Sequence, residues 1–441
     1  MRRITALLLM LLLLPGLVAA EDDFDLDDIL SDADPDVVKN TYSQPGNADD
    51  ILLDENNEPV SIYEEDGSIL ITLTATGDFT VGGDSRKSTN IWMNELKKHD
   101  NDYNFALANV RDIFLADDLT IVNFEGTLTD STYVPSEKRN NEFLFSASPD
   151  HVSMLVDNGI EAVSLENNHV LDHGQAVYEE TQQHLDDAGI VWSNSTHVGV
   201  MEVKGIQIAM LSYLCIDRYN TLWDQVPKDI AAAKEQYPIV IVSFHWGKEM
   251  AYSPTQNQIK MGRLAVDSGA DLVLGHHSHR MNPIEYYNGV YICYSLGNFC
   301  FGGNRKAYQE NKNRTPAVQD AAPALMLRAV LTFDDDGTYK GQQITLYPVQ
   351  TTGIDRAAGE TVQVNNYQPK FITGPLAAHV LHLMQIDMNY DASKTPKYSN
   401  AESINKTLRA LVMAREEELA AMDSSEGMEA MTLPFLPAEA E

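Results

Sequence analysis

Residues 270–279 read ADLVLGHHSH, an apolar strand-like run that stops at a glycine and three histidines. The same pattern, an apolar run ending in polar or imidazole side chains, recurs at five other places. They are Gly77-Asp78, Asn123-Phe124-Glu125, Asn167-Asn168-His169 with Asp172, His245-Trp246-Gly247 with Glu249, and Ser295-Leu296-Gly297-Asn298-Phe299. Strands that end in such side chains hold them at the rim of a sheet, on rigid backbone. The six clusters therefore predict a metal-centred pocket.

The clusters lie in a chain that alternates between strand-like and helix-like runs from about Ser68. Apolar, β-branched runs predict strands, and runs with 3.6-residue periodicity predict helices. The expected strands are at 69–76, 119–122, 160–165, 238–244 and 270–274, and the expected helices at 102–116, 149–158, 174–188 and 254–268. Hairpins are expected at 198–213, 284–296 and 324–348. This alternation indicates an α/β fold with helices on both faces of its sheets, and the hairpins make those sheets mixed.

The N-terminus has the pattern of a secretory signal peptide. Arg2 and Arg3 precede an apolar run at 4–14, and the small residues Val18-Ala19-Ala20 precede acidic residues. Cleavage after Ala20 would release the mature chain. The alternative is an uncleaved membrane anchor, although the apolar run is short for a complete span. Either way the protein is expected outside the cytoplasm, secreted or held at the cell envelope.

The remaining chain divides by composition. We expect a signal peptide (1–20), an acidic linker (21–67), an α/β domain (68–350) and a C-terminal helical extension (351–441). The linker carries many carboxylates but lacks the spacing of a calcium-binding loop, so a solvated segment is the favoured interpretation. The extension has helical periodicity at 375–388 and 401–422.

The charge balance limits the partners of this protein. Its 441 residues have a formal net charge of −34, which becomes two units more negative after cleavage at Ala20. Such a charge repels nucleic acid and anionic lipid, so no nucleic-acid partner is expected. It also repels polyanionic substrates unless bound metal ions reverse the local field. The three cysteines, Cys215, Cys293 and Cys300, do not make a disulfide scaffold. The sequence allows one disulfide between two of them, or three buried thiols.

The polar clusters supply the ligands that a hard or borderline divalent ion binds. Such an ion prefers carboxylate, amide oxygen and imidazole ligands. The expected ligands are Asp78, Glu125, Asn168, His245, His277 and His279. A carboxylate such as Glu125 or Asp78 could bridge two ions. A lone histidine at a strand end is usually structural, so the prediction rests on the ordered set and not on any single residue.

Other residues of the clusters are expected to support or complement these ligands. His169 follows Asn168 directly and could protonate a leaving group, and Asp172 could orient its imidazole. We therefore predict His169 and Asp172 as catalytic residues. The residues expected to support the ligands are Asn123, Glu249, His276 and Asn298. The chain has neither a Gly-x-Ser-x-Gly nucleophile motif nor a phosphate-binding Walker loop.

The six clusters, in this order, resemble the CapA-like family of capsule or poly-γ-glutamate synthesis proteins, which is related to calcineurin-like metallophosphoesterases. The resemblance covers about residues 68–305. It implies a four-layer α/β/β/α sandwich with the site at the strand ends, holding one or two divalent ions (Mn, Fe or Zn). By motif, the implied roles are a first metal carboxylate at Asp78, a bridging carboxylate at Glu125, an amide ligand with its catalytic neighbour at Asn168-His169, and imidazole ligands at His245, His277 and His279.

The sequence departs from the phosphoesterase pattern at three places. Thr80 stands where the pattern has a histidine two residues after its first aspartate. Asn123 and Glu125 replace a Gly-Asp-x-x-Asp element, and Ser278 stands where the family has proline. The leading hypothesis is an extracytoplasmic protein of capsule or poly-γ-glutamate biosynthesis or export. Its expected partners are the anionic polymer or its precursor and a membrane-bound synthase. A secreted metal-dependent phosphoesterase and a non-catalytic scaffold for polymer assembly are the alternatives, so an enzymatic role stays open.

Overall fold

The computed structural model describes residues 62–64, 66–84, 86, 91–141, 143–216, 219–302, 321–353 and 364–372, together with Ala377, Val380, 431–432 and 436–437. The expected signal peptide and almost all of the acidic linker lie outside the described residues. So do the expected C-terminal helices, apart from Ala377 and Val380, which are helical and buried. No helix in the described part of the chain combines the length and apolar character required to span a membrane.

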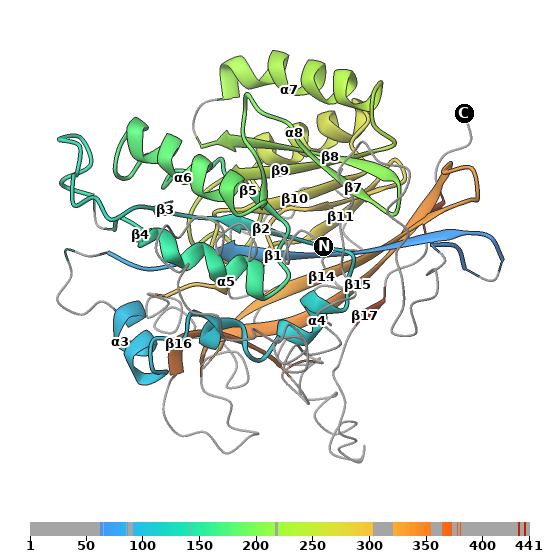
Figure 1. Ribbon diagram of the computed structural model, residues 1–441. Helices are drawn as coiled ribbons and strands as arrows, with labels where there is room; N and C mark the ends of the chain where they lie inside the picture. The colour runs from blue at the N-terminus through green and yellow to red at the C-terminus, as the bar shows by residue number, and fades with distance from the viewer. Residues whose placement is uncertain are drawn as a thin grey trace, which may run out of the picture.

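The larger sheet has ten strands and is built around β1 (Ile69–Phe79). β1 pairs in parallel with β2 (Leu119–Phe124) and antiparallel with β14 (Ala321–Phe333), so the sheet is mixed (Figure 1). Its other strands are β5 (Ala162–Ser164), β6 (Val191–Ser193), β13 (Asn298–Cys300), β15 (Tyr339–Gly353), β16 (Val364–Phe371), β17 (Met431–Thr432) and β18 (Leu436–Pro437). The last three pair with β15, so strands from beyond residue 350 extend the same sheet.

The second sheet has six strands in the order β11-β12-β10-β9-β8-β7. Its strands are β7 (Gly199–Val203), β8 (Ile206–Cys215), β9 (Ile239–Trp246), β10 (Leu272–His276), β11 (Ile284–Tyr287) and β12 (Val290–Cys293). The middle strands are parallel, and an antiparallel hairpin closes each edge. A short third sheet pairs β3 (Thr127–Leu128) with β4 (Ser146–Ala147).

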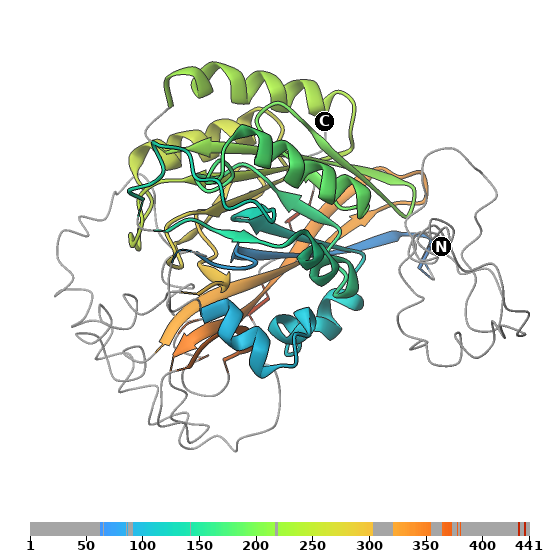
Figure 2. The same cartoon turned by 60° about the vertical axis from the view of Figure 1, so that its left-hand side comes forward.

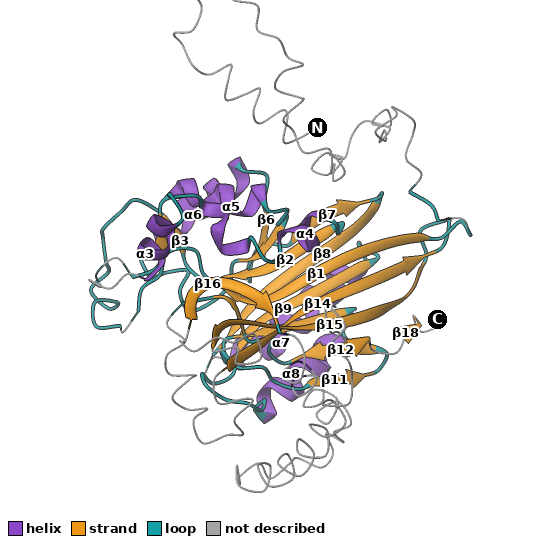
Figure 3. Ribbon diagram, turned by 90° about the horizontal axis from the view of Figure 1, so that it is seen from below, coloured by secondary structure: helices purple, strands orange, loops and turns teal. Residues whose placement is uncertain are grey.

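Apolar side chains between the two large sheets form the central core, which includes Leu73, Ile121, Ile208 and Leu274. Helices cover the outer faces, as Figures 1 and 2 show. α7 (Tyr219–Lys234) and α8 (Gln256–Asp267) pack on the six-stranded sheet. The elements on the larger sheet are α3 (Ile91–Lys98), η2 (Tyr103–Leu107), α4 (Arg111–Leu115), η3 (Pro149–His151), α5 (Val152–Asp157) and α6 (Gln175–Asp187). Figure 3 shows the strands of both sheets between these helices.

The prediction of an α/β protein with mixed sheets is confirmed. The expected hairpins turn at Lys204-Gly205 and Asn288-Gly289, where all four residues have positive φ, as a two-residue turn requires. The helix expected at 102–116 is instead two short segments, because the Asp102 side chain caps a separate 3₁₀ turn at Asn104 N. Cys215, Cys293 and Cys300 are free and buried. The match to the metallophosphoesterase sandwich stays a prediction.

The strand register brings the ends of several strands to one edge. Asp78 of β1 lies opposite Asn123 of β2 and Asn298 of β13, and in the second sheet His276 lies opposite His245. Gly77 lets β1 approach the turn before β13, since a Cβ there would lie 1.9 Å from Gly297 O. This close approach allows the backbone N–H of Asp78 to donate a hydrogen bond to Gly297 O at 2.8 Å.

The first prediction concerns this close approach. Gly77→Ala should lower the free energy of unfolding by about 3 kcal/mol, because the new methyl group overlaps a backbone oxygen. Gly205→Ala is the control: its Cβ meets nothing within 4 Å, so only its positive φ of 77° matters and the cost should be about 1 kcal/mol. Urea unfolding followed by tryptophan fluorescence measures both. Equal losses would show that the Gly77–Gly297 approach is unimportant.

Candidate metal centre

Asp78 is the centre of the part of the site that the larger sheet contributes. Its side chain is fully buried, and Oδ1 accepts hydrogen bonds from Asn123 Nδ2 at 3.0 Å and from the backbone N–H of His277 at 3.2 Å. Asp78 Oδ2 lies 3.1 Å from His279 Nδ1. His279 Nδ1 also lies 2.9 Å from Asn298 Oδ1. The end of β1 therefore contacts the loop that follows β10 of the other sheet.

His245, at the end of β9, is the corresponding centre in the second sheet. Its Nε2 lies 2.7 Å from Asn168 Oδ1 and 3.0 Å from His277 Nδ1, and its Nδ1 lies 3.3 Å from Asn123 Nδ2. Asn123 therefore contacts both Asp78 and His245. The ends of the two sheets meet in one polar cluster, which is almost completely buried.

The cluster contains two sets of three side chains. Within each set, the atoms that could bind a metal ion lie within 4.8 Å of one another. One set is Asp78, Glu125 and His245, and the other is Glu249, His277 and His279. The first set contains two buried oxygens that accept no hydrogen bond, namely the carboxylate oxygens of Glu125. Buried carboxylate oxygens of this kind are costly unless a cation or donor satisfies them. The residues present therefore fit a divalent metal ion.

The electrostatics of the cluster follow from burial and crowding. Burial and the charge of Asp78 raise the pKa of Glu125 well above its usual value. Burial lowers the pKa of His245 well below normal and that of His277 to about 3, which keeps both imidazoles neutral. For His279, burial is outweighed by its hydrogen bond to Asp78 and by the charge of Glu125, so its pKa rises to about 9. Neutral imidazoles are the form that binds metal.

His169 lies at the edge of this cluster in a fixed orientation. Its Nδ1 is 2.7 Å from Asp172 Oδ2, and its Nε2 is 3.5 Å from Glu125 Oε1. Asn167 Oδ1 accepts a hydrogen bond from the backbone N–H of His169 and so holds the loop. The buried Asp172 also accepts a hydrogen bond from the backbone N–H of Phe145. This arrangement leaves Nε2 of His169 facing the candidate metal ligands.

The structure brings the twelve predicted site residues to one edge of the two sheets. Asn123 and Asn298 contact Asp78 and His279 as described, and His276 Nδ1 lies 3.6 Å from Asp78 Oδ1. Of these twelve residues, Glu249 alone is exposed to solvent. The arrangement is therefore the one that the prediction requires, while the role of each residue stays a prediction.

Sequence reasoning missed Lys138 and two phenylalanines. Lys138 Nζ donates to Asn168 O at 3.1 Å and to Asp172 Oδ1 at 3.0 Å, so it ties two predicted site residues together. The ring of Phe145 lies 4.4 Å from that of His169, and the ring of Phe301 lies 4.8 Å from that of His279. Lys138 comes from the long connection between β3 and β4, which has no motif, so only the folded chain reveals its role.

Comparison with known proteins places the site within a matched region. The family model described as bacterial capsule synthesis protein PGA_cap matches residues 72–303, which contain all twelve residues. The PGA biosynthesis protein CapA of Bacillus subtilis is 31% identical over 264 residues, covering 55% of this chain and 65% of that protein. The capsule biosynthesis protein CapA of Bacillus anthracis is 25% identical over 256 residues, covering 52% of this chain and 60% of that protein. The chain thus spans less than two thirds of the length of these relatives.

The second prediction follows from the pKa of Glu125. Because this pKa is raised, the folded state favours the protonated form of Glu125. The stability that protonated Glu125 contributes is complete below the pKa of the unfolded chain, about 4.3, and is lost as pH rises through the pKa of the folded state. Glu125→Gln stays neutral. In EDTA at pH 8 the variant should be more stable to urea than the wild type by about 1–3 kcal/mol, with little difference at pH 4.

Addition of Mn²⁺ at pH 8 should reverse this order. The ion stabilises the wild type through Glu125, whereas the neutral amide of the variant binds it weakly. Asp117→Asn is the control: Asp117 is buried with a pKa raised to about 7, but it hydrogen-bonds to Thr120 and belongs to neither ligand set, so its Mn²⁺-dependent stabilisation should match the wild type. Equal Mn²⁺ effects in Glu125→Gln and the wild type would contradict the assignment of Glu125.

Proposed function

This chain belongs to the bacterial capsule synthesis protein family, and from that premise we propose that it takes part in the biosynthesis or export of a poly-γ-glutamate capsule polymer. The observation that carries the proposal is the family match, which spans residues 72–303 and includes the whole candidate metal centre. The names of the two similar Bacillus proteins, which refer to PGA and to capsule biosynthesis, support the same polymer class.

We further propose that the protein works outside the cytoplasm. The N-terminal pattern of Arg2, Arg3 and an apolar run before Ala20 supports export. The partners proposed are the anionic polymer or its precursor and a membrane-bound synthase. Detection of the protein in the cytoplasm alone, after cell fractionation, would contradict this location.

The proposed cofactor is one or two divalent ions, Mn, Fe or Zn, at the meeting edge of the sheets. Asp78, Glu125 and His245 would hold an ion, with Asn168, His277 and His279 beside them. A bound ion supplies positive charge that polarises a phosphoryl or carbonyl oxygen. The two packed sheets and their outer helices support the assignment to a four-layer α/β/β/α sandwich related to metallophosphoesterases.

The chain's own residues would bind and orient the substrate and move one proton. Asp172 holds Nδ1 of His169, so Nε2 is the nitrogen that can give a proton to a leaving group beside Glu125. Lys138 fixes Asp172 and so keeps the imidazole in place. The ring of Phe145 packs against the imidazole of His169.

The third prediction tests the role in polymer production. Deletion of the gene in its own host should reduce capsule glutamate, measured after acid hydrolysis of the surface polymer. Wild-type protein should restore it, whereas His169→Ala should restore less than about a tenth, since a positioned proton donor contributes about 10²–10⁴-fold to rate. Asp78→Asn should restore equally little, because it removes a carboxylate proposed to hold the ion.

The outcomes of that experiment separate the hypotheses. Full polymer production by both variants, at equal protein levels, would favour the non-catalytic scaffold. Unchanged polymer after gene deletion would overturn the proposed function.

A secreted phosphoesterase is the second candidate, and the orientation of His169 by Asp172 beside Glu125 favours it. The fourth prediction is that purified protein with Mn²⁺ hydrolyses bis(p-nitrophenyl) phosphate. His169→Ala should reduce the rate by about 10²–10⁴-fold. His184→Ala, on the partly exposed surface of α6, is the control and should leave it unchanged. Absence of turnover by the wild-type protein would reject this candidate.

A further inference from the structure

Exposed apolar side chains gather in the two loops beside His169. Seven large apolar side chains are exposed in the described part of the chain, and three of these are Tyr133, Phe143 and Leu171. The first two belong to the connection between β3 and β4, and Leu171 belongs to the loop that carries His169. The loops touch, since His173 Nδ1 lies 2.7 Å from Tyr133 O. An apolar rim at a site proposed to bind a polyanion indicates a ligand with apolar parts.

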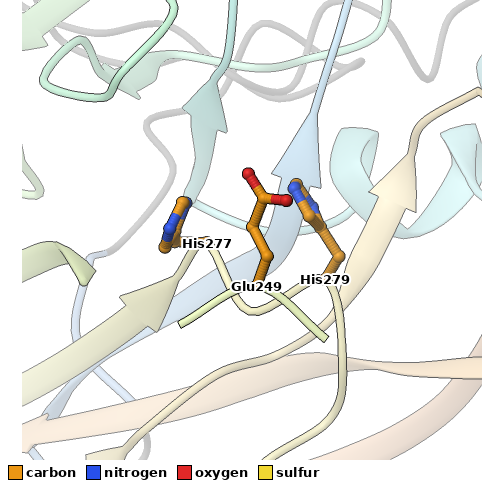
Figure 4. A group of neighbouring side chains, drawn as sticks. All are labelled: Glu249, His277 and His279. Atoms are coloured by element: carbon orange, nitrogen blue, oxygen red, sulfur yellow. The ribbon is translucent and has the colours of Figure 1, made fainter. Parts of the chain in front are cut away.

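A line of three aromatic rings leads from this rim to the metal centre, and we call Phe143, Phe145 and Phe301 the aromatic track. Phe143 is 40% exposed, Phe145 is half-buried and Phe301 is buried. The ring centroids of Phe143 and Phe145 lie 6.2 Å apart with the rings nearly parallel, and Phe301 lies 5.6 Å further along. Phe145 packs against His169, and Phe301 packs against His279, one of the side chains that Figure 4 shows. The track therefore runs from solvent to the proposed ligands.

An ion pair with a buried carboxylate fixes the segment that carries the exposed ring. Arg86 donates to Asn141 O at 3.0 Å and pairs with the buried Asp84. Asp84 Oδ2 in turn accepts a hydrogen bond from the backbone N–H of Leu144 at 3.2 Å. The backbone on both sides of Phe143 is thus held in place before any ligand binds, which lowers the entropy cost of binding.

Two basic side chains beside the track are already paired. Lys138 pairs with Asp172, whose carboxylate also accepts from the backbone N–H of Phe145, and Arg86 pairs with Asp84. Attraction to a cation is also common to all polyanions, whereas specificity requires a difference in affinity between them. Recognition of one polymer therefore requires contact with its uncharged part.

A γ-linked glutamyl chain has apolar groups in its backbone. Each unit places two methylene groups between its carboxylate-bearing carbon and the next amide, whereas α-linked glutamate carries its methylene groups in side chains. The two additional bonds lengthen the extended repeat from about 3.8 Å to about 6 Å. The spacing of 6.2 Å between the rings of Phe143 and Phe145 matches this repeat, so successive units can place their methylene groups on successive rings.

We propose that the aromatic track selects a γ-linked glutamyl backbone, with methylene pairs packed on Phe143 and Phe145 and the carboxylates turned to solvent and to the metal centre. The inference rests on the proposed function and adds to it the residues that determine which polymer is bound. Phe143 contributes apolar contact area and belongs to neither candidate ligand set. The track thereby orders the polymer at the entrance to His169.

Binding of defined glutamate oligomers by the full-length protein tests this assignment. Fluorescein-labelled γ-linked and α-linked glutamate decamers are titrated with protein in the presence of Mn²⁺, and fluorescence anisotropy gives the Kd of each. The wild type should bind the γ-linked decamer about 10-fold more tightly, since two buried methylene groups contribute about that factor. Phe143→Ala should remove the preference, and Phe143→Tyr, which keeps the ring, should retain it.

Tyr286→Ala is the matched control. Tyr286 is also an exposed aromatic residue, but it lies on β11, the edge strand of the six-stranded sheet, so its loss should leave the preference unchanged. Equal binding of the two decamers by the wild type, or an unchanged preference in Phe143→Ala, would overturn the aromatic track and leave the proposed function intact. Binding of neither decamer by the wild type would overturn the polymer as a partner, and the track with it.

A lipid surface is the other ligand that an apolar rim could meet. The net charge of −34 repels anionic lipid, so the wild-type protein should not sediment with phosphatidylglycerol vesicles. Sedimentation of the wild type with these vesicles that Phe143→Ala abolishes, together with equal affinities for the two decamers, would overturn the proposal and identify the rim as a membrane contact.

Discussion

The candidate site depends on an amide that contacts both sheets. Asn123 Nδ2 lies 3.0 Å from Asp78 Oδ1 and 3.3 Å from His245 Nδ1, so one side chain at the end of β2 contacts the end of β1 in its own sheet and the end of β9 in the other. Everything polar at the edge is arranged around that junction, because buried polar groups must find partners among themselves.

The residues around that junction organise the site, but several of them lower the free energy of unfolding. Glu125 is buried with two unpaired oxygens, and His277 and His279 adopt left-handed backbone conformations. Each of these features costs free energy that the three apolar cores must offset. Such costs persist where geometry serves binding or chemistry and not folding. The same cost makes a cation effective, since an ion that neutralises Glu125 removes the penalty for its burial.

The sequence predicts the α/β class and the gathering of the site because strand ends carry readable polar clusters. The positions of Asp78, His245 and His277 follow from apolar runs of definite length, and a parallel register aligns their ends. The contacts of Lys138 were not predictable, since they depend on how the connection between β3 and β4 crosses the site. The helix expected at 102–116 was wrong because periodicity does not register the side-chain cap at Asp102 that starts a separate turn.

The charge of the chain bears on how such a site meets an anionic polymer. A formal charge of −34 repels a polyanion at long range, and the segment from Glu21 to Asp36 has no Lys or Arg to offset it. At the site the balance is local: Lys138 pairs with Asp172, and Nδ1 of His279 lies 3.1 Å from Asp78 Oδ2. Divalent ions would make that edge positive within a few ångströms while salt screens the rest of the surface beyond about 10 Å. Under the proposed function, an extended polyanion would bind through the residues nearest the proposed metal ion, and repulsion of the remaining length would favour release of the polymer.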